Sequence, residues 1–286
     1  MDPVASAPPR RLKQLLRAIA TGVIGAALLL TGSLWWFQER LIYRAPRYAS
    51  AELSTLPAGL SALRDPALPE SIVGFYRAPI GAGLPRRLWL FFGGNGDVAL
   101  RWDPLISPSV TNDIGLLMVE YPGYGARAGT PSPESLLAGT EATLQALAVE
   151  LKTSVAELEP RVAVVGYSIG SAAALLYAAH HPAQRIILFS PFTSMLAMAR
   201  RNVGWPLCNL LRHRYDNEAS LRLIRAKGMP KMTILHGEHD GLIPYQMGQT
   251  LAAEAAGSEL ELVPDAGHGD VIDVAQARLR ALLAQP

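Results

Sequence analysis

The sequence predicts an α/β fold with a mostly parallel central sheet, because strand-like and helix-like runs alternate along most of the chain. Strand-like runs cover residues 71–80, 86–94, 114–123, 161–168, 184–192, 231–240 and 260–268, and helix-like runs cover 134–151, 169–181, 245–256 and 270–284. Half of the 286 residues are apolar, so a large buried core is available. Such alternation places helices on both faces of a sheet. Ligands then bind outside the carboxyl ends of the strands.

An uncharged apolar run over residues 18–37 predicts a transmembrane anchor. Its length matches the roughly 20 residues that a helix needs to cross the hydrocarbon core of a bilayer. Aromatic residues end it at Trp35, Trp36 and Phe37, as is typical of a membrane interface. A cleaved signal peptide is the alternative, but the run is longer than a usual signal core and no small-x-small cleavage site follows it.

The residues around the apolar run set the expected topology and domain limits. A basic N-terminal tail, residues 1–17, precedes the span and holds Arg10, Arg11, Lys13 and Arg17, whereas Arg40, Arg44 and Arg47 follow the span. The basic excess in front favours a single-pass protein with a cytoplasmic N-terminus and the following domain on the opposite side. Residues 38–70 are rich in Pro, Ala and Ser and predict a linker, so the folded domain is expected over 71–286.

Composition excludes several other classes of function. The net charge is only +2, and beyond the N-terminal region the arginines are dispersed, so no nucleic-acid partner is expected. The single cysteine, Cys208, can form neither an intramolecular disulfide nor a thiolate metal cluster. We expect it to be a small buried apolar side chain.

Ser168 lies between Gly166 and Gly170, where a β-branched strand gives way to an alanine-rich helix in "RVAVVGYSIGSAAALLYAAHH". A serine on a sharp strand-to-helix turn exposes its hydroxyl, and the two glycines remove side chains that would collide with the tight backbone. The helix N-terminus also favours negative charge that develops beside the serine. Helix capping is the alternative role for Ser168. Capping does not explain the glycines, so we predict a nucleophile.

A nucleophilic serine needs an imidazole base and a carboxylate that orients the imidazole. His180 and His181 close the helix that begins after Ser168 and are too far away. His268 lies in a glycine-bounded loop after the last strand, and Asp240 ends the strand 231–240 between the two. The order Ser, acid, His is a known order of this constellation. We therefore predict His268 as the base and Asp240 as the orienting acid.

A metal site is the alternative interpretation of the acid turn, because His236, Glu238 and His239 stand close to Asp240. Consecutive turn residues point in different directions and no further ligand cluster is apparent, so no metal is expected.

The glycine-rich turn after the strand 86–94 is the predicted source of oxyanion donors. It comprises Gly93, Gly94, Asn95 and Gly96. We expect the backbone N–H groups of Asn95 and of Ile169, the residue after the nucleophile, to bind the developing negative charge. A phosphate-binding loop is the alternative, but the required Lys and Ser or Thr do not follow the glycines.

Taken together, these motifs resemble the α/β-hydrolase superfamily and, within it, small N-terminally membrane-anchored serine hydrolases of the α/β-hydrolase-domain (ABHD-like) type. The resemblance covers residues 35–286 and is carried by "FQERLIYR", "LFFGGNGDV", "VEYPGYGARAG", "VVGYSIGSAAAL", "LFSPFTSM", "ILHGEHDGLIP" and "PDAGHGD". It implies an α/β-hydrolase fold with Ser168 as nucleophile, Asp240 as orienting acid and His268 as base. One departure is Gly93-Gly94, where relatives commonly have His-Gly.

The resemblance implies a membrane-tethered serine hydrolase that cleaves a carboxylic ester or thioester through an acyl-enzyme, without a cofactor. Lipids or acylated molecules are the implied substrates, and the bilayer is the implied partner of the anchor. A serine peptidase on the same fold and a non-catalytic tethered binding module are the alternatives. Residues 193–229 correspond to a short cap, which either lines an acyl pocket or covers core. We expect the anchor to place the enzyme at the membrane without completing its active site.

Overall fold

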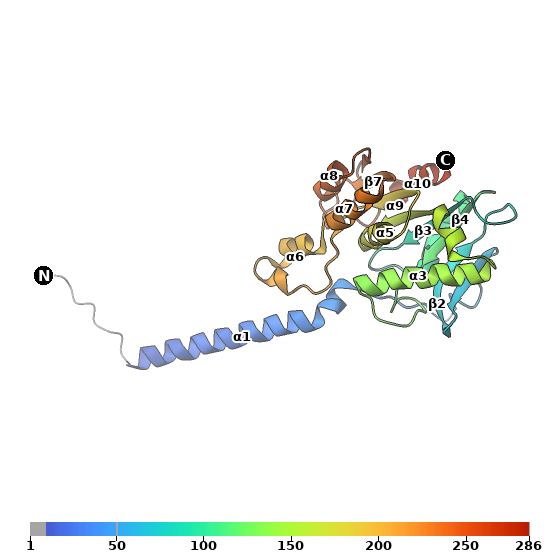
Figure 1. Ribbon diagram of the computed structural model, residues 1–286. Helices are drawn as coiled ribbons and strands as arrows, with labels where there is room; N and C mark the ends of the chain where they lie inside the picture. The colour runs from blue at the N-terminus through green and yellow to red at the C-terminus, as the bar shows by residue number, and fades with distance from the viewer. Residues whose placement is uncertain (1–9, 50, 286) are drawn as a thin grey trace.

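An eight-stranded sheet forms the centre of the structure (Figure 1). The computed structural model describes residues 10–49 and 51–285. In sheet order the strands are β1 (Leu60–Asp65), β2 (Leu68–Arg77), β4 (Ile114–Val119), β3 (Arg87–Phe92), β5 (Val162–Tyr167), β6 (Arg185–Phe189), β7 (Lys231–Gly237) and β8 (Glu259–Val263). Neighbouring strands are parallel from β4 to β8, whereas β2 is antiparallel to both β1 and β4. The predicted mostly parallel sheet is confirmed.

Side chains alternate between the two faces of the strands and form two buried cores. In β3, Leu88 and Leu90 belong to one core, whereas Trp89 and Phe91 belong to the other. The helices that cover the first core are α3 (Pro133–Glu150), α5 (Ile169–His180), α7 (Asn217–Lys227) and α8 (Tyr245–Glu254). The second core is covered by η1 (Ala99–Trp102), α2 (Asp103–Ile106), α9 (Val271–Val274) and α10 (Gln276–Ala284). The helix expected over 270–284 is thus interrupted at Ala275.

Short helical turns complete the connections between these elements. They are η2 (Ser107–Ser109), α4 (Val155–Leu158) and η3 (Glu159–Arg161). Because the sheet is buried on both faces, its strands read as nearly continuous apolar runs in the sequence. The loops at the carboxyl ends of β3, β5, β7 and β8 carry the predicted site residues.

A long helix, α1 (Arg10–Ile42), projects from the domain (Figure 1). It has 33 residues, and within the described residues it alone is long and apolar enough to cross a membrane. The helix extends beyond the expected span of 18–37 at both ends. Residues 10–17 of the expected basic tail are helical, and residues 1–9 of that tail lie outside the described residues.

The segment 38–70, for which the sequence predicts a linker, instead contains the end of α1, all of β1 and the beginning of β2. Leu60 and Leu63 of β1 are buried, so the folded domain begins about ten residues earlier than expected. Register shifts between Leu63 and Asp65 interrupt the pairing with β2. A bulged strand loses the strict alternation of side chains by which a strand is recognised in a sequence.

The segment 193–229 divides into two parts. α7 contributes Leu221 and Ile224 to the first core and therefore belongs to the body of the domain. The cap proper consists of α6 (Met195–Val203), η4 (Leu207–Leu210) and the chain that leads from η4 to α7. η4 contacts the end of α1. In Figure 1, α6 stands away from the sheet on the side from which α1 projects.

Candidate active site

Ser168 occupies a strained turn between β5 and α5. Its backbone has φ 55° and ψ −120°, a conformation that L-residues rarely adopt. The Ser168 N–H donates to the Phe189 carbonyl at 2.9 Å, which ties the turn to β6. A Cβ at position 166 would lie 2.3 Å from the Gly170 carbonyl oxygen, and one at position 170 would lie 2.1 Å from the Phe92 carbonyl oxygen. Both predicted glycines are therefore required by backbone contacts.

His268 lies on the loop after β8 and faces this serine. Its Nε2 is 3.0 Å from the Ser168 Oγ. The Tyr167 hydroxyl donates to the His268 carbonyl oxygen at 2.6 Å, and the two rings have centroids 5.3 Å apart. Tyr167 thus holds the histidine loop against the nucleophile turn. The sequence offers no signal for this role, because the two residues are far apart along the chain.

Asp240 follows β7 and completes a hydrogen-bonded chain of three side chains. Its Oδ2 is 2.8 Å from His268 Nδ1, and its Oδ1 accepts the N–H groups of Leu242 and Ile243. Burial alone would raise the pKa of the Asp240 carboxyl, but hydrogen bonds from His236, His268 and the Ile243 N–H lower this pKa well below its ordinary range. An ionised Asp240 accepts from the Nδ1–H tautomer of His268, which leaves Nε2 free to accept the serine proton.

His236 lies beneath the acid, on β7, and is fully buried. Its Nε2 is 2.9 Å from the Ile243 carbonyl oxygen and 3.4 Å from Asp240 Oδ2. A proton on this nitrogen therefore stabilises the carboxylate at Oδ2, the oxygen that His268 also contacts. His239 is exposed and takes no part in the hydrogen-bonded chain. Among the described residues, no group of three or more His, Cys, Asp or Glu side chains is arranged to hold a metal.

The predicted oxyanion donors border the same pocket as Ser168. Ile169 is the first residue of α5, a position at which a helix leaves the backbone N–H without an internal acceptor. The Asn95 side chain is fixed, because its Oδ1 accepts from the Arg44 N–H at 2.7 Å and from the Tyr124 hydroxyl at 3.1 Å. The Gly94 N–H donates to Asp97 Oδ2 at 2.7 Å and stabilises the loop further.

A largely apolar pocket of about 320 Å³ lies over Ser168, within the size range of small-molecule sites. Among the residues that the structure describes, no charged side chain lines it. The cap contributes residues from Met195 to Leu211, and Leu242 and Ile243 follow the acid. The end of α1 contributes Leu34, Gln38, Leu41 and Ile42. Leu34 lies within the predicted anchor 18–37, so the anchor borders the pocket. That the anchor does not complete the active site stays a prediction.

Comparisons with known proteins agree with this architecture. The chain is 30% identical over 263 residues to the uncharacterized protein MT2364 of Mycobacterium tuberculosis, with 90% of this chain and 86% of that protein covered. It is also 30% identical to the human α/β-hydrolase domain-containing protein 17B, over 53% of this chain and 49% of that protein. The esterase PF2001 of Pyrococcus furiosus superposes with a TM-score of 0.61 at 14% identity, covering 84% of this chain and 95% of that structure.

The chain has the α/β-hydrolase fold, and about half of it is related to the α/β-hydrolase domain-containing protein 17B. A scan against protein-family models found no match. The α/β-hydrolase fold that the sequence motifs predict is confirmed, including the long apolar helix in front of the domain. Within this fold, a hydroxyl, an imidazole and an ionised carboxylate form one hydrogen-bonded chain. Such an arrangement can perform acyl transfer.

The contact between Gly170 and the Phe92 carbonyl leads to a stability prediction. Gly170→Ala should lower the free energy of unfolding by about 3 kcal/mol, because the new Cβ meets rigid backbone. Thermal or denaturant unfolding measures the change. Gly96→Ala is the matched control, since a Cβ at position 96 meets no atom within 4 Å. Equal stability of the two variants would contradict the described turn.

Proposed function

We propose that this α/β-hydrolase is a membrane-tethered serine hydrolase that cleaves carboxylic esters or thioesters through an acyl-enzyme. The observation that carries the proposal is the hydrogen-bonded chain Ser168–His268–Asp240 at the base of an uncharged pocket. In this proposal Ser168 is the nucleophile, His268 the general base and acid, and Asp240 the orienting carboxylate.

The reaction proceeds in two acyl transfers. Ser168 Oγ attacks the substrate carbonyl while His268 Nε2 takes the hydroxyl proton, and the N–H groups of Asn95 and Ile169 bind the resulting oxyanion. Collapse of this intermediate breaks the ester or thioester bond, and His268 returns the proton to the departing alcohol or thiol. Water then attacks the acyl-serine with His268 again acting as base, which releases the carboxylic acid and regenerates Ser168. The cycle requires no cofactor.

The pocket supports an apolar acyl group as the part of the substrate next to Ser168. Methionine, leucine and isoleucine side chains dominate its lining, whereas a peptide substrate would leave polar amides without partners there. We therefore favour esters and thioesters over peptides. The hydrogen-bonded triad geometry also favours catalysis over a purely binding role.

The bilayer is the proposed partner of α1, with residues 18–37 in the hydrocarbon core and the catalytic domain after them. The basic residues before the span favour a cytoplasmic N-terminus and a catalytic domain on the opposite side. Substrates that carry an acyl chain in the membrane then lie beside the enzyme.

A fluorophosphonate probe tests the nucleophile. The full-length protein should be labelled, and Ser168→Ala should abolish the label because no activated hydroxyl remains. Ser171→Ala is the matched control, since the Ser171 hydroxyl instead bonds to the carbonyl oxygens of Gly166 and Phe189. Label that persists in Ser168→Ala would overturn the assignment.

Substitutions of the two supporting residues test the rest of the triad. His268→Ala and Asp240→Asn should each lower kcat for a soluble ester by about 1,000-fold or more, because members of one catalytic unit fail together. The exposed His239 provides the control, and His239→Ala should change kcat less than about threefold. Steady-state kinetics with a chromogenic ester measures both. Comparable losses in His239→Ala and His268→Ala would show that the acid turn has been misassigned.

A further inference from the structure

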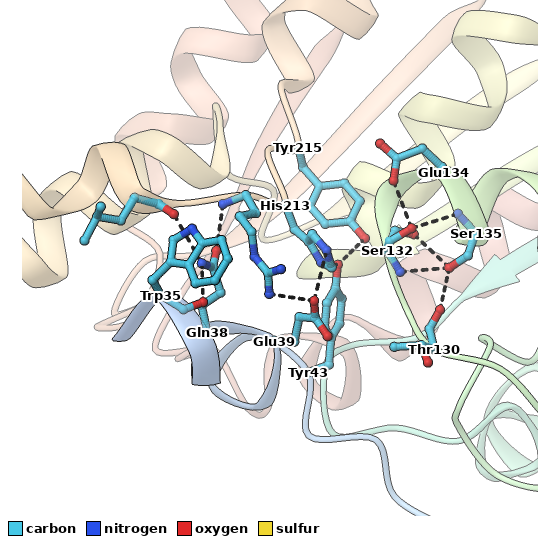
Figure 2. A network of polar contacts seen from close by, with 12 residues as sticks. Trp35, Gln38, Glu39, Tyr43, Thr130, Ser132, Glu134, Ser135, His213 and Tyr215 are labelled. Atoms are coloured by element: carbon cyan, nitrogen blue, oxygen red, sulfur yellow. Dashed lines mark hydrogen bonds and ion pairs between the residues drawn. The ribbon is translucent and has the colours of Figure 1, made fainter. Parts of the chain in front are cut away.

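Gln38 joins the end of the membrane helix to the cap. It is only 7% exposed, although it lies on a helix whose apolar span is exposed. Its Nε2 donates to the carbonyl oxygens of Trp35 and Leu210 at 2.9 and 3.2 Å, and its Oε1 accepts the Arg212 N–H at 2.7 Å (Figure 2). One side chain thus pairs with backbone groups on either side of Leu211, which is itself part of the pocket wall.

Further contacts make this junction a fixed one. The Arg212 guanidinium lies 4.8 Å from the centre of the Trp35 ring and 2.8 Å from Glu39 Oε1. The Tyr43 and Tyr215 hydroxyls are hydrogen-bonded at 2.9 Å and both side chains are buried (Figure 2). Residues 35–43, at the end of α1 and just after it, are therefore in contact with residues 210–215 of the cap. These contacts hold α1 in one position relative to the cap.

The pocket over Ser168 lies between the end of α1 and the cap. Leu34, Leu41 and Ile42 of α1 form one wall, and the apolar side chains of α6 and η4 form another. A ligand bound to Ser168 inside this pocket therefore touches the same helix that is long enough to cross the bilayer.

The mouth of the pocket carries features of a membrane-facing surface. Of the residues that line the pocket, Leu41, Val203 and Leu242 are 65%, 48% and 53% exposed. Trp205, in the cap chain between Val203 and Leu207, is 75% exposed. Exposed Arg200 and Arg201 lie on the same cap helix as Val203. An exposed tryptophan beside arginines is typical of the headgroup region of a bilayer. The expected hydrocarbon span ends at Phe37, so Leu34 and Leu41 lie at or near this boundary.

We propose that the end of α1 is a wall of the acyl-binding pocket and that Gln38 is the positioning residue that holds this wall against the cap. The acyl chain of a membrane-embedded ester or thioester then passes along α1, from the leaflet into the pocket, and reaches Ser168 without crossing water. The inference rests on the proposed function, because it concerns how the acyl group of that reaction is bound. It assigns the membrane helix a part in substrate selection.

Two chromogenic substrates separate this role from general stability. An acetyl ester reacts at Ser168 without filling the pocket. A dodecanoyl ester is long enough to contact the wall that the end of α1 forms. In the full-length, detergent-solubilised protein, Gln38→Ala should raise KM for the dodecanoyl ester about tenfold, with kcat unchanged, because apolar contact along the chain is lost. The kcat/KM for the acetyl ester should fall much less, so the ratio of the two kcat/KM values should change about fivefold or more. For Gln38→Glu, KM for the dodecanoyl ester should lie between the values for wild type and Gln38→Ala, because this variant keeps an acceptor for the Arg212 N–H.

Gln14→Ala is the matched control, because Gln14 is an exposed glutamine on the same helix and does not line the pocket. It should leave both substrates unaffected. Leu34→Trp is the second test variant. Its larger side chain occupies part of the pocket on the α1 side but leaves every hydrogen bond of Gln38 in place. It should shorten the longest acyl chain that is accepted, and it decides the question if Gln38→Ala does not fold.

The results distinguish failure of the inference from failure of the proposed function. An equal loss of activity on both esters in Gln38→Ala would overturn the role of α1. An unchanged ratio of kcat/KM for the two esters in either test variant would overturn it as well. Neither result would affect the proposed serine hydrolase activity. Absence of ester hydrolysis and of fluorophosphonate labelling in the wild type would overturn the proposed function, and the inference with it.

Discussion

The tight turn at Ser168 is the constraint on which the rest of the site depends. Its positive φ is tolerated because the Ser168 N–H is held by β6 and because glycines occupy the two positions where backbone segments meet most closely. The parallel sheet supplies the remaining groups at the same edge. Asn95 follows β3, Asp240 follows β7 and His268 lies on the loop after β8. A change in the order of these strands would separate the three side chains.

The polar and apolar halves of the site have different origins. Asp240 is held ionised by hydrogen bonds from two histidines and from backbone N–H groups, which come from β7 and from the loops at the carboxyl edge of the sheet. The apolar pocket is built by the cap and by α1, which are peripheral to the sheet. The proposed chemistry is therefore set by the sheet, whereas the proposed choice of acyl group is set by elements at the membrane side. This division explains how one reaction can be combined with different substrates in this fold.

Local sequence patterns predict the sheet, the paired glycines and the positions of Ser168, Asp240 and His268, because each lies where a strand ends and a turn begins. The bulged edge strand β1 escapes prediction, since its register shifts remove the alternation of side chains. Gln38 and Tyr167 also escape, because their partners Leu210 and His268 lie 172 and 101 residues away. His236 is visible in the sequence as a neighbour of Asp240. Only the structure shows that its Nε2 lies 3.4 Å from Asp240 Oδ2 and stabilises the carboxylate.

In the proposed reaction Ser168 carries the acyl group during turnover. The most direct measurement is acid-quenched, rapid-mixing mass spectrometry of the full-length protein with an activated acyl ester, followed by peptide mapping. We expect an intact-mass increase equal to one acyl group, located on Ser168. It should appear before steady-state turnover and disappear when substrate is exhausted. Single-turnover experiments should be run under conditions that slow deacylation. Hydrolysis without any acylated protein under these conditions would contradict an acyl-enzyme at Ser168. An acyl group located on another residue would contradict it as well.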